Sequence, residues 1–375
     1  MRKKVLFLGT QNIKEPVMNG GMQCSKRNFD LIAQVTGEDD LFSAIIWNSA
    51  EQYRHNRFFK RCGNNKESLI SSIRMCRLYK CSEEKKILAY IKQVNPDILF
   101  TDTTLLGKIL KKVDRTVKIV VFLHNIEVEY ARHRVKKEGW RYLPAYIATA
   151  YNEKLSLKYA SRVICLNHRD SKLAGKIYGR TATDRSIDLL PISFKDRFDR
   201  DKINRKDSSR ELLFIGSNFG PNYDGIKWFI QNIMHKLQEY KLIIVGKDFE
   251  KVREELERDN VSVVGTVENL DDYYYKYFNI ILPIKYGDGM KVKTAEAMMF
   301  GMNIFATDEA LEGYEAEHVQ GIFRCNSADD FIREIRLSSR INKEGLWNQD
   351  VRDVYMKNHC FDNQVEQMKK ILCDW

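Results

Sequence analysis

The chain has 375 residues, of which 43% are hydrophobic and 30% are charged, and its formal net charge is +11. This length exceeds what one ordinary core supports, so we expect two domains of typical size. The composition is that of a folded protein, and no apolar run approaches the roughly 20 residues that a membrane-spanning helix needs. Eight cysteines without a CxxC pair or metal-ligand spacing favour reduced thiols and a cytosolic protein.

Short apolar runs alternate with amphipathic stretches through the first half of the chain. The chain opens with basic residues, but the apolar run that follows is only about five residues long, and a signal peptide needs a longer one. We interpret this start as a buried first strand. A capping pair, Asn167 and Asp170, predicts the start of one helix. Continuous apolar strands between helices predict a parallel sheet covered on both faces. The expected strands cover residues 5–9, 41–47, 97–102, 118–125 and 162–167, and the first helix runs from about Met22 to Val35.

Residues 195–211 break this pattern, because they are polar, charged and without period. We interpret them as a linker. The alternation then restarts, and a helical tail follows from about Asp350. The sequence therefore predicts two α/β domains of similar size, over 1–194 and 195–354. The expected strands of the second domain cover residues 212–217, 241–246, 261–265, 279–284 and 303–307.

The positive charge favours an anionic partner, and much of it lies between Arg54 and Lys92. Phe58, Phe59 and Tyr79 are interleaved with these basic residues. Two interpretations stay open: a solvated helical face, or a surface over 54–92 that rests on anionic lipid. Nucleic acid is not expected as a partner, because no nucleic-acid-binding module surrounds the stretch.

Ligands of open parallel sheets lie beyond the carboxyl ends of the strands, so the loops there are candidates for a site. In the first loop, Gly20 and Gly21 precede a helix whose free N–H groups can face an anion. This signal is weak alone, because a glycine pair is more often a simple turn. It is also not the GxGxxG pattern of dinucleotide-binding proteins.

The second domain opens with LFIGSNFGPNYDGIKWF. Gly216 and Ser217 end the expected strand, and Asn222 precedes a helix that we expect to begin near Tyr223. This arrangement again offers a helix N-terminus to an anion.

A third loop, YGDGMKVKTAEAMMFGMNIFAT, combines several features of an anion site. Gly287 and Gly289 allow the backbone to wrap a ligand, and Lys291 and Lys293 add positive charge. We expect Glu296 to begin a helix, where its carboxylate is favoured by the dipole and can accept hydrogen bonds from a ribose diol. Any one of these residues alone is more often structural. Their coincidence in one loop indicates a nucleoside diphosphate site.

The stretch GDGMKVKTAEAMMFGMNIFAT resembles the donor-binding segment of the retaining glycosyltransferases of family 4, which have the GT-B fold. Three further stretches look like other parts of that family: LFIGSNFGPNYDGIKWF, VVGTVENLDDYY and FLHNIEVEY. The resemblance implies two Rossmann-like, doubly wound domains facing across a cleft. It also implies that a helix at about 355–375 crosses back to the first domain, which holds the acceptor.

The resemblance implies roles for donor-binding residues. Glu296 would bind the ribose, and Lys293 would neutralise the diphosphate. Gly289 and Met290 would meet the sugar or phosphates through backbone groups, and Gly21 would approach the diphosphate from the first domain. The remaining donor-binding candidates are those of the loop that opens the second domain, Gly216, Ser217 and Asn222.

The catalytic candidates are Lys291, His124 and Asp288. Lys291 would stabilise the leaving diphosphate, and His124 would hydrogen-bond the transferred sugar. Asp288 stands where the family has an acidic residue eight positions before Glu296, but it is shorter than the usual glutamate. We expect no metal and no other cofactor, because the DRD triplet at 199–201 lies in the expected linker with no strand to position it.

These features predict a glycosyltransferase that moves a sugar from a nucleotide-diphosphate sugar to a glycan or lipid-linked acceptor. The resemblance implies retention and work in surface polysaccharide or glycoconjugate synthesis, by a cytoplasmic enzyme that is peripheral to the inner face of the membrane. Two alternatives stay open. One is a nucleotide-sugar epimerase of the same fold, and the other is a catalytically silent, nucleotide-sugar-binding scaffold at the membrane.

Overall fold

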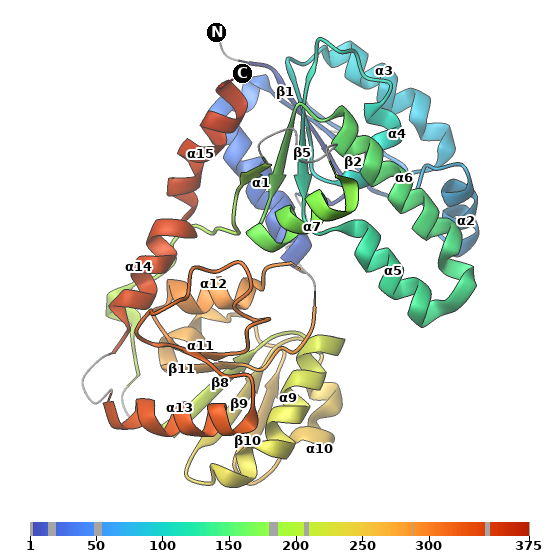
Figure 1. Cartoon of the computed structure of the whole chain (residues 1–375). Helices are drawn as coiled ribbons and strands as arrows, with labels where there is room; N and C mark the ends of the chain where they lie inside the picture. Colours follow the sequence, from blue (N-terminus) through green and yellow to red (C-terminus); the bar gives the residue numbers. More distant parts are fainter. Residues whose placement is uncertain are drawn as a thin grey trace. The chain divides into compact units, whose positions relative to one another are not determined.

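The computed structural model describes residues 3–13, 20–48, 55–179, 187–205, 210–287, 289–341 and 346–374. The chain divides into two compact units (Figure 1). The first comprises Met1–Pro191 together with Gln364–Trp375, and the second comprises Ile192–Asn363. The end of the chain therefore belongs, by its contacts, to the first unit.

The first unit is built on a parallel sheet, which in the described residues has seven strands in the order β3-β2-β1-β4-β5-β6-β7. Its strands are β1 Val5–Gly9, β2 Leu41–Ile46, β3 Asn56–Phe59, β4 Ile98–Thr101, β5 Lys118–Leu123, β6 Arg162–Cys165 and β7 Ile187–Leu189. Its α-helices are α1 Gly20–Thr36, α2 Asn65–Ile73, α3 Glu84–Val94, α4 Gly107–Leu110, α5 Glu127–Glu138, α6 Leu143–Tyr159, α7 His168–Tyr178 and most of α15 Phe361–Cys373.

Both faces of this sheet are buried, as the continuous apolar strands predict. Phe7, Phe100 and Phe122 line one face, where Phe7 meets Phe29 of α1 with ring centroids 5.4 Å apart. On the other face, alternate strand residues such as Leu6 and Leu8 pack with α3, α4 and α6 in one apolar cluster. The first strand is thus fully inside the fold.

The second unit holds another parallel sheet, with six strands in the described residues in the order β10-β9-β8-β11-β12-β13. Its strands are β8 Glu211–Ile215, β9 Lys241–Val245, β10 Val261–Gly265, β11 Asn279–Leu282, β12 Asn303–Ala306 and β13 Ile322–Arg324. Its α-helices are α9 Gly220–Asn232, α10 Arg253–Leu256, α11 Asp271–Lys276, α12 Val292–Met299, α13 Ala328–Ile341 and α14 Gln349–Asn358.

The two sheets share one topological feature. In each, the chain builds outward from one central strand and then crosses to the other side, so the winding reverses between β1 and β4 and again between β8 and β11. Crevices at such switch points are the usual ligand sites of open α/β sheets. The predicted α/β class with two doubly wound parallel sheets is confirmed.

The basic stretch between Arg54 and Lys92 differs from the expected helical face or single surface. Arg54 lies outside the described residues, and Asn56–Phe59 forms edge strand β3. Phe59 and Tyr79 are 3% and 0% exposed, so they cannot insert into a bilayer. The cations are partly engaged inside the unit as well, since Arg77 donates to Thr149 and to the Tyr142 hydroxyl.

Within the described parts of the chain, no helix is both long and apolar enough to cross a membrane.

Candidate active site

The loop after β8 and the first turns of α9 and α12 bring four of the predicted donor-binding residues together. Lys293 Nζ donates to Asn222 Oδ1 at 2.5 Å, and Asn222 Nδ2 donates to the Ser217 carbonyl at 2.8 Å. Gly216 gives these side chains room, because a Cβ there would lie 2.8 Å from Lys293 Nζ and 2.9 Å from Asn222 Nδ2. Gly216, Ser217, Asn222 and Lys293 therefore form one polar cluster at the switch point of the second unit.

The helices that position this cluster begin earlier than the sequence suggested. Helix α9 begins at Gly220 rather than near Tyr223, with a proline in its first turn. Helix α12 begins at Val292, so the expectation that Glu296 begins a helix is wrong. Gly289, at φ +64°, turns the chain before α12, and no later residue breaks the helical stretch. Glu296 is its fifth residue, beyond the first turn where the dipole acts most strongly.

Lys291 is the N-cap residue of α12 and has an internal partner. Its Nζ donates to Glu309 Oε1 at 2.7 Å and to the Gly289 carbonyl at 2.8 Å. The Tyr314 hydroxyl donates to the Lys291 carbonyl at 2.8 Å and holds the backbone in place. Sequence reasoning missed Glu309 and Tyr314, which lie beyond β12 and have no motif that marks them.

Electrostatics link Lys291 with Lys293, which is the second residue of α12. Burial lowers the pKa of Lys293 to about 7, and repulsion from Lys291 acts in the same direction, while Glu296 opposes both. An ammonium group that is this costly to charge gains most from an anion placed beside it. The Phe214 ring, 4.9 Å from Nζ, supports the charged form through its π face.

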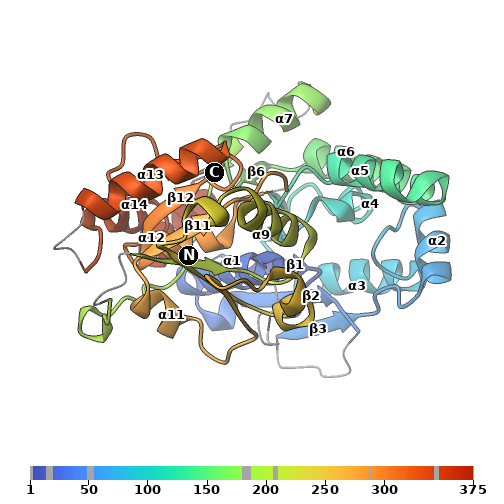
Figure 2. The same ribbon diagram turned by 90° about the horizontal axis from the view of Figure 1, so that it is seen from below.

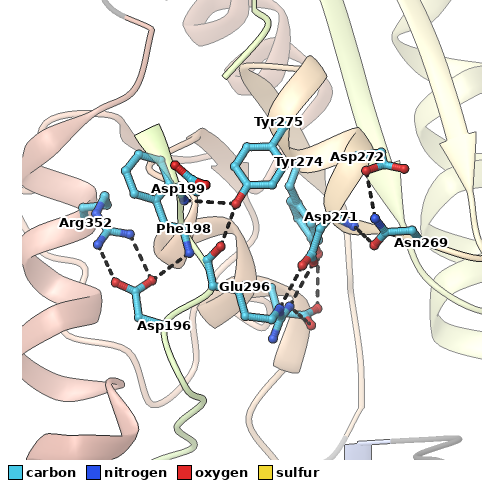
Figure 3. Close-up of polar contacts among 11 residues, drawn as sticks. Asp196, Phe198, Asp199, Asn269, Asp271, Asp272, Tyr274, Tyr275, Glu296 and Arg352 are labelled. Carbon is cyan, nitrogen blue, oxygen red and sulfur yellow. Dashed lines mark hydrogen bonds and ion pairs between the residues drawn. The ribbon is translucent and has the colours of Figure 1, made fainter. Parts of the chain in front are cut away.

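Glu296 is paired with residues that the sequence did not single out (Figure 3). Arg197 Nη2 lies 3.5 Å from Oε1, and the Tyr274 hydroxyl donates to Oε2 at 3.2 Å. Burial raises the pKa of the Glu296 carboxyl, and Arg197 and Tyr274 only partly oppose this. Arg197 comes from the segment that we interpreted as a linker, and Tyr274 from the quoted stretch VVGTVENLDDYY.

A second polar cluster lies at the switch point of the first unit. Asp102, which directly follows β4 and is 2% exposed, accepts from the Ser25 hydroxyl and, at 2.6 Å, from Asn28 Nδ2. His124 Nε2 lies 3.2 Å from Asp102 Oδ2 and 3.1 Å from its carbonyl oxygen. The strand-end stretch DILFTD could have marked Asp102, because it ends at the same sheet edge as the strand before His124.

His124 is fixed on two sides. Burial lowers its pKa, but the Asp102 carboxylate and the Cys24 thiol outweigh burial, and the net pKa lies well above the ordinary histidine value. Burial likewise raises the pKa of Cys24, but Arg27 and His124 outweigh it and the net shift is downward. Arg27 Nη2 lies 3.3 Å from Cys24 Sγ. His124 thus has the partners of a stable imidazolium.

The remaining candidates are placed as follows. Asp288 lies outside the described residues. Gly289 has a left-handed backbone, at φ +64°, and Met290 is 7% exposed. Gly21 is exposed in the first turn of α1. In the described residues, no group of three or more His, Cys, Asp or Glu side chains is arranged to hold a metal ion.

One protein-family model matches part of the chain. Residues 209–337 match the family model described as Glycosyl transferases group 1. No curated protein sequence matches the chain.

Solved structures match over nearly the full length. Sucrose-phosphate synthase from Thermosynechococcus elongatus is 15% identical with a TM-score of 0.71, and 99% of each chain is covered. HepE of Anabaena in complex with UDP is 13% identical with a TM-score of 0.67, and 99% of this chain and 100% of HepE are covered. WaaG, a glycosyltransferase involved in lipopolysaccharide biosynthesis, is 16% identical with a TM-score of 0.65, and 99% of this chain and 100% of WaaG are covered. The chain therefore has the GT-B fold and carries a glycosyl transferases group 1 domain at residues 209–337, which confirms the predicted enzyme class at this level.

Proposed function

We propose that the protein transfers a sugar from a nucleotide-diphosphate sugar to a hydroxyl group of an acceptor, with retention and without a resident metal. The observation that carries this proposal is the cluster of Lys293, Asn222 and Gly216 at the switch point of the second unit, with Lys291 and Glu296 on the same loop and helix. HepE has been solved with UDP-glucose, which supports a nucleotide-sugar donor.

The proposed chemistry needs only charges that the chain supplies. The bond between the anomeric carbon and the diphosphate oxygen breaks, and the acceptor oxygen bonds to that carbon. The acceptor proton passes to the departing phosphate. Lys291 and Lys293 stabilise the charge that grows on the diphosphate, and Glu296 binds the ribose. Retention follows from the resemblance of residues 287–307 to retaining enzymes.

A panel of radiolabelled nucleotide sugars tests this function. Each donor is incubated with the protein and with glycan or lipid-linked acceptors, and the products are separated. We expect nucleotide release coupled to a labelled acceptor, unchanged in excess chelator. An isomerised donor without transfer would instead make the protein an epimerase, and binding without turnover would make it a scaffold. A complete, magnesium-reversible loss of transfer would contradict metal-free catalysis.

We further propose that an anionic membrane surface contacts the first unit through α2, α5 and α6, rather than through the aromatic residues of 54–92. Helices α2 and α5 both pack against α6 (Figures 1 and 2). The short turn Gly139–Tyr142 joins α5 to α6. The exposed large apolar side chains of these helices and of this turn include Leu69, Ile70, Ile73, Trp140, Leu143 and Ile147. We propose that they share one surface, and we call them the apolar patch.

Basic residues accompany the apolar patch. Lys66, Arg74, Lys136, Lys137 and Arg141 are all exposed on or beside the same elements. Exposed apolar side chains among cations fit the interface of an anionic bilayer, where each cation contributes about 1 kcal/mol. Trp140 is 80% and Ile73 is 62% exposed, which makes them the best points of insertion.

Vesicle flotation tests this surface. We expect the wild-type protein to float with phosphatidylglycerol vesicles at low salt and to be released by high salt. Trp140→Glu and Ile73→Glu should abolish flotation, whereas Leu337→Glu, at a leucine of the second unit that is 42% exposed, should not. Flotation that is unchanged in both patch variants would contradict the proposed surface.

A further inference from the structure

Residues 196–205, which we call the strap, fasten α11 to α12. The Tyr275 hydroxyl donates to the Arg197 carbonyl at 2.6 Å. Arg205 Nη2 donates to the Tyr274 carbonyl at 2.6 Å and to a second carbonyl, 2.9 Å away, at the end of α12. The strap therefore joins the helix that carries Tyr274 to the helix that carries Glu296, although its sequence is that of a polar linker.

The start of the strap is anchored to α14. Arg352 Nη2 donates to Asp196 Oδ2 at 2.7 Å (Figure 3). The Nη1 atom of Arg352 donates to the Met299 carbonyl at 2.5 Å. The Arg352 guanidinium also lies 4.0 Å from the centroid of the Phe198 ring. Asp196 and Phe198 flank Arg197, so the backbone of Arg197 is held on both sides.

The side chain of Arg197 is held in turn by a two-point contact. Its Nε and Nη2 donate to the two carboxylate oxygens of Asp271 at 3.0 and 3.2 Å. This leaves Nη2 at 3.5 Å from Glu296, as an ionic contact rather than a short hydrogen bond. A carboxylate has about four lone-pair sites, so a Glu296 that contacts Arg197 and Tyr274 still has two for a ligand.

We propose that Arg197 is the positioning residue of Glu296. It keeps the carboxylate ionised and oriented to accept two hydroxyl groups of a ribose, and Asp271 holds Arg197 in that place. This inference rests on the proposed function, because it assigns Glu296 to the ribose. It differs from a role in which Arg197 competes with the nucleotide for Glu296, since positioning predicts weaker nucleotide binding when Arg197 is removed and competition predicts tighter binding.

The first experiment measures binding of UDP, ADP and GDP by calorimetry between pH 5 and 9. Arg197→Gln should weaken the best-bound nucleotide about tenfold at pH 7, because a charged partner of the binding group is lost. As the pH falls, the variant should also lose nucleotide binding at a higher pH than the wild-type protein does, because Glu296 without Arg197 takes up its proton more readily. Arg197→Lys keeps the positive charge, so nucleotide binding at low pH should again depend on pH as it does in the wild-type protein.

Adjacent carboxylates supply a matched control. Asp271 holds Arg197, whereas Asp272 accepts from Asn269 at 2.8 Å. Asp271→Asn should shift binding in the same direction as Arg197→Gln but less, and Asp272→Asn should leave it unchanged. Tighter binding in Arg197→Gln, or equal effects of the two aspartate variants, would overturn the positioning role.

A second measurement needs no nucleotide. Carbon-13 NMR of ¹³C-glutamate-labelled protein, with the Glu296 signal assigned from Glu296→Gln, gives the titration of that carboxyl group. We expect its midpoint to rise in Arg197→Gln and to stay near the wild-type value in Arg197→Lys. An unchanged midpoint in Arg197→Gln would overturn the role of Arg197 but not the proposed function. A wild-type protein that binds none of the three nucleotides would overturn the proposed function.

Discussion

The switch points of the two units hold different chemistry at the same place in the same topology. In the first unit, Asp102 lies buried beyond β4 and is satisfied by Ser25, Asn28 and His124. In the second unit, two lysines follow β11, and burial depresses the pKa of Lys293 to about 7.

This difference shows that the topology fixes where a ligand can lie, whereas the loop residues decide which ligand it is. A cluster of lysines suits a diphosphate. A histidine held by a carboxylate suits sugar or acceptor hydroxyl groups. If variants in one unit changed the function assigned to the other unit, this assignment of different ligands to the two units would be wrong.

The largest effect is expected from the second unit. Glu296→Gln should lower kcat/KM for the donor on the order of 100-fold or more, because the ribose loses its charged acceptor. Steady-state kinetics with the active donor measure this, and circular dichroism checks the fold. Glu317→Gln, at an exposed glutamate of the same unit, is the control. Near-normal activity of folded Glu296→Gln would remove the nucleotide site from this loop.

Lys291→Ala sharpens the comparison within the second unit. Charge grows on the leaving diphosphate mainly in the transition state, so kcat should fall on the order of 100-fold while the Kd of the free nucleotide changes little. Lys285→Ala is the control, since Lys285 lies just before this loop with its Nζ over the Trp228 ring. An unchanged kcat in Lys291→Ala, with the loss in Lys293→Ala instead, would show that the other lysine has this role.

A smaller effect is expected from the first unit. Asp102→Asn puts an amide where Ser25 and Asn28 both donate, so the free energy of unfolding should fall by about 1–3 kcal/mol. Transfer should fall about tenfold because His124 loses its partner. Nucleotide binding, measured by calorimetry, should stay within about twofold of wild type. A large loss of nucleotide binding would break the separation between the two clusters.

The smallest expected effect is the uptake of a proton when the nucleotide binds. Lys293 is charged below its pKa of about 7 and mostly neutral at pH 8, and a bound diphosphate favours the charged form. Nucleotide binding at pH 8 should therefore take up at most about 0.9 proton. Calorimetry in buffers of different ionisation enthalpy measures this number. The uptake should vanish in Lys293→Met, and an equal uptake in that variant would assign the proton elsewhere.

Much of the fold follows from the sequence because continuous apolar runs mark buried parallel strands. The same patterns placed the loops of Gly216 and Lys293 at the ends of two expected strands. The structure shows that these strands, β8 and β11, are neighbours and that their residues meet. Strand β3 was missed because it is a short edge strand inside a basic stretch. The sequence placed Glu296 at a helix start, whereas α12 begins at Val292, four residues earlier. No residue between them marks the helix start in the sequence.

Arg197 could not be predicted, for a physical reason. Residues 195–211 have no periodicity, and periodicity is the only local sign of what a segment packs against. The strap is held by individual polar contacts of Asp196, Arg197 and Arg205 with residues that lie 69 to 156 positions further along the chain. Such contacts leave no pattern in a single sequence. The Lys291–Glu309 pair is hidden in the same way.

Hydrogen exchange with and without UDP tests the central claim most directly, because it locates the nucleotide without assuming a reaction. We expect protection of amides in peptides covering 216–222 and 287–296 of the wild-type protein, and its loss in Glu296→Gln. Peptides around β3 serve as an internal reference and should not change. Protection confined to other peptides, or equal protection in Glu296→Gln, would contradict a nucleotide site at the switch point of the second unit.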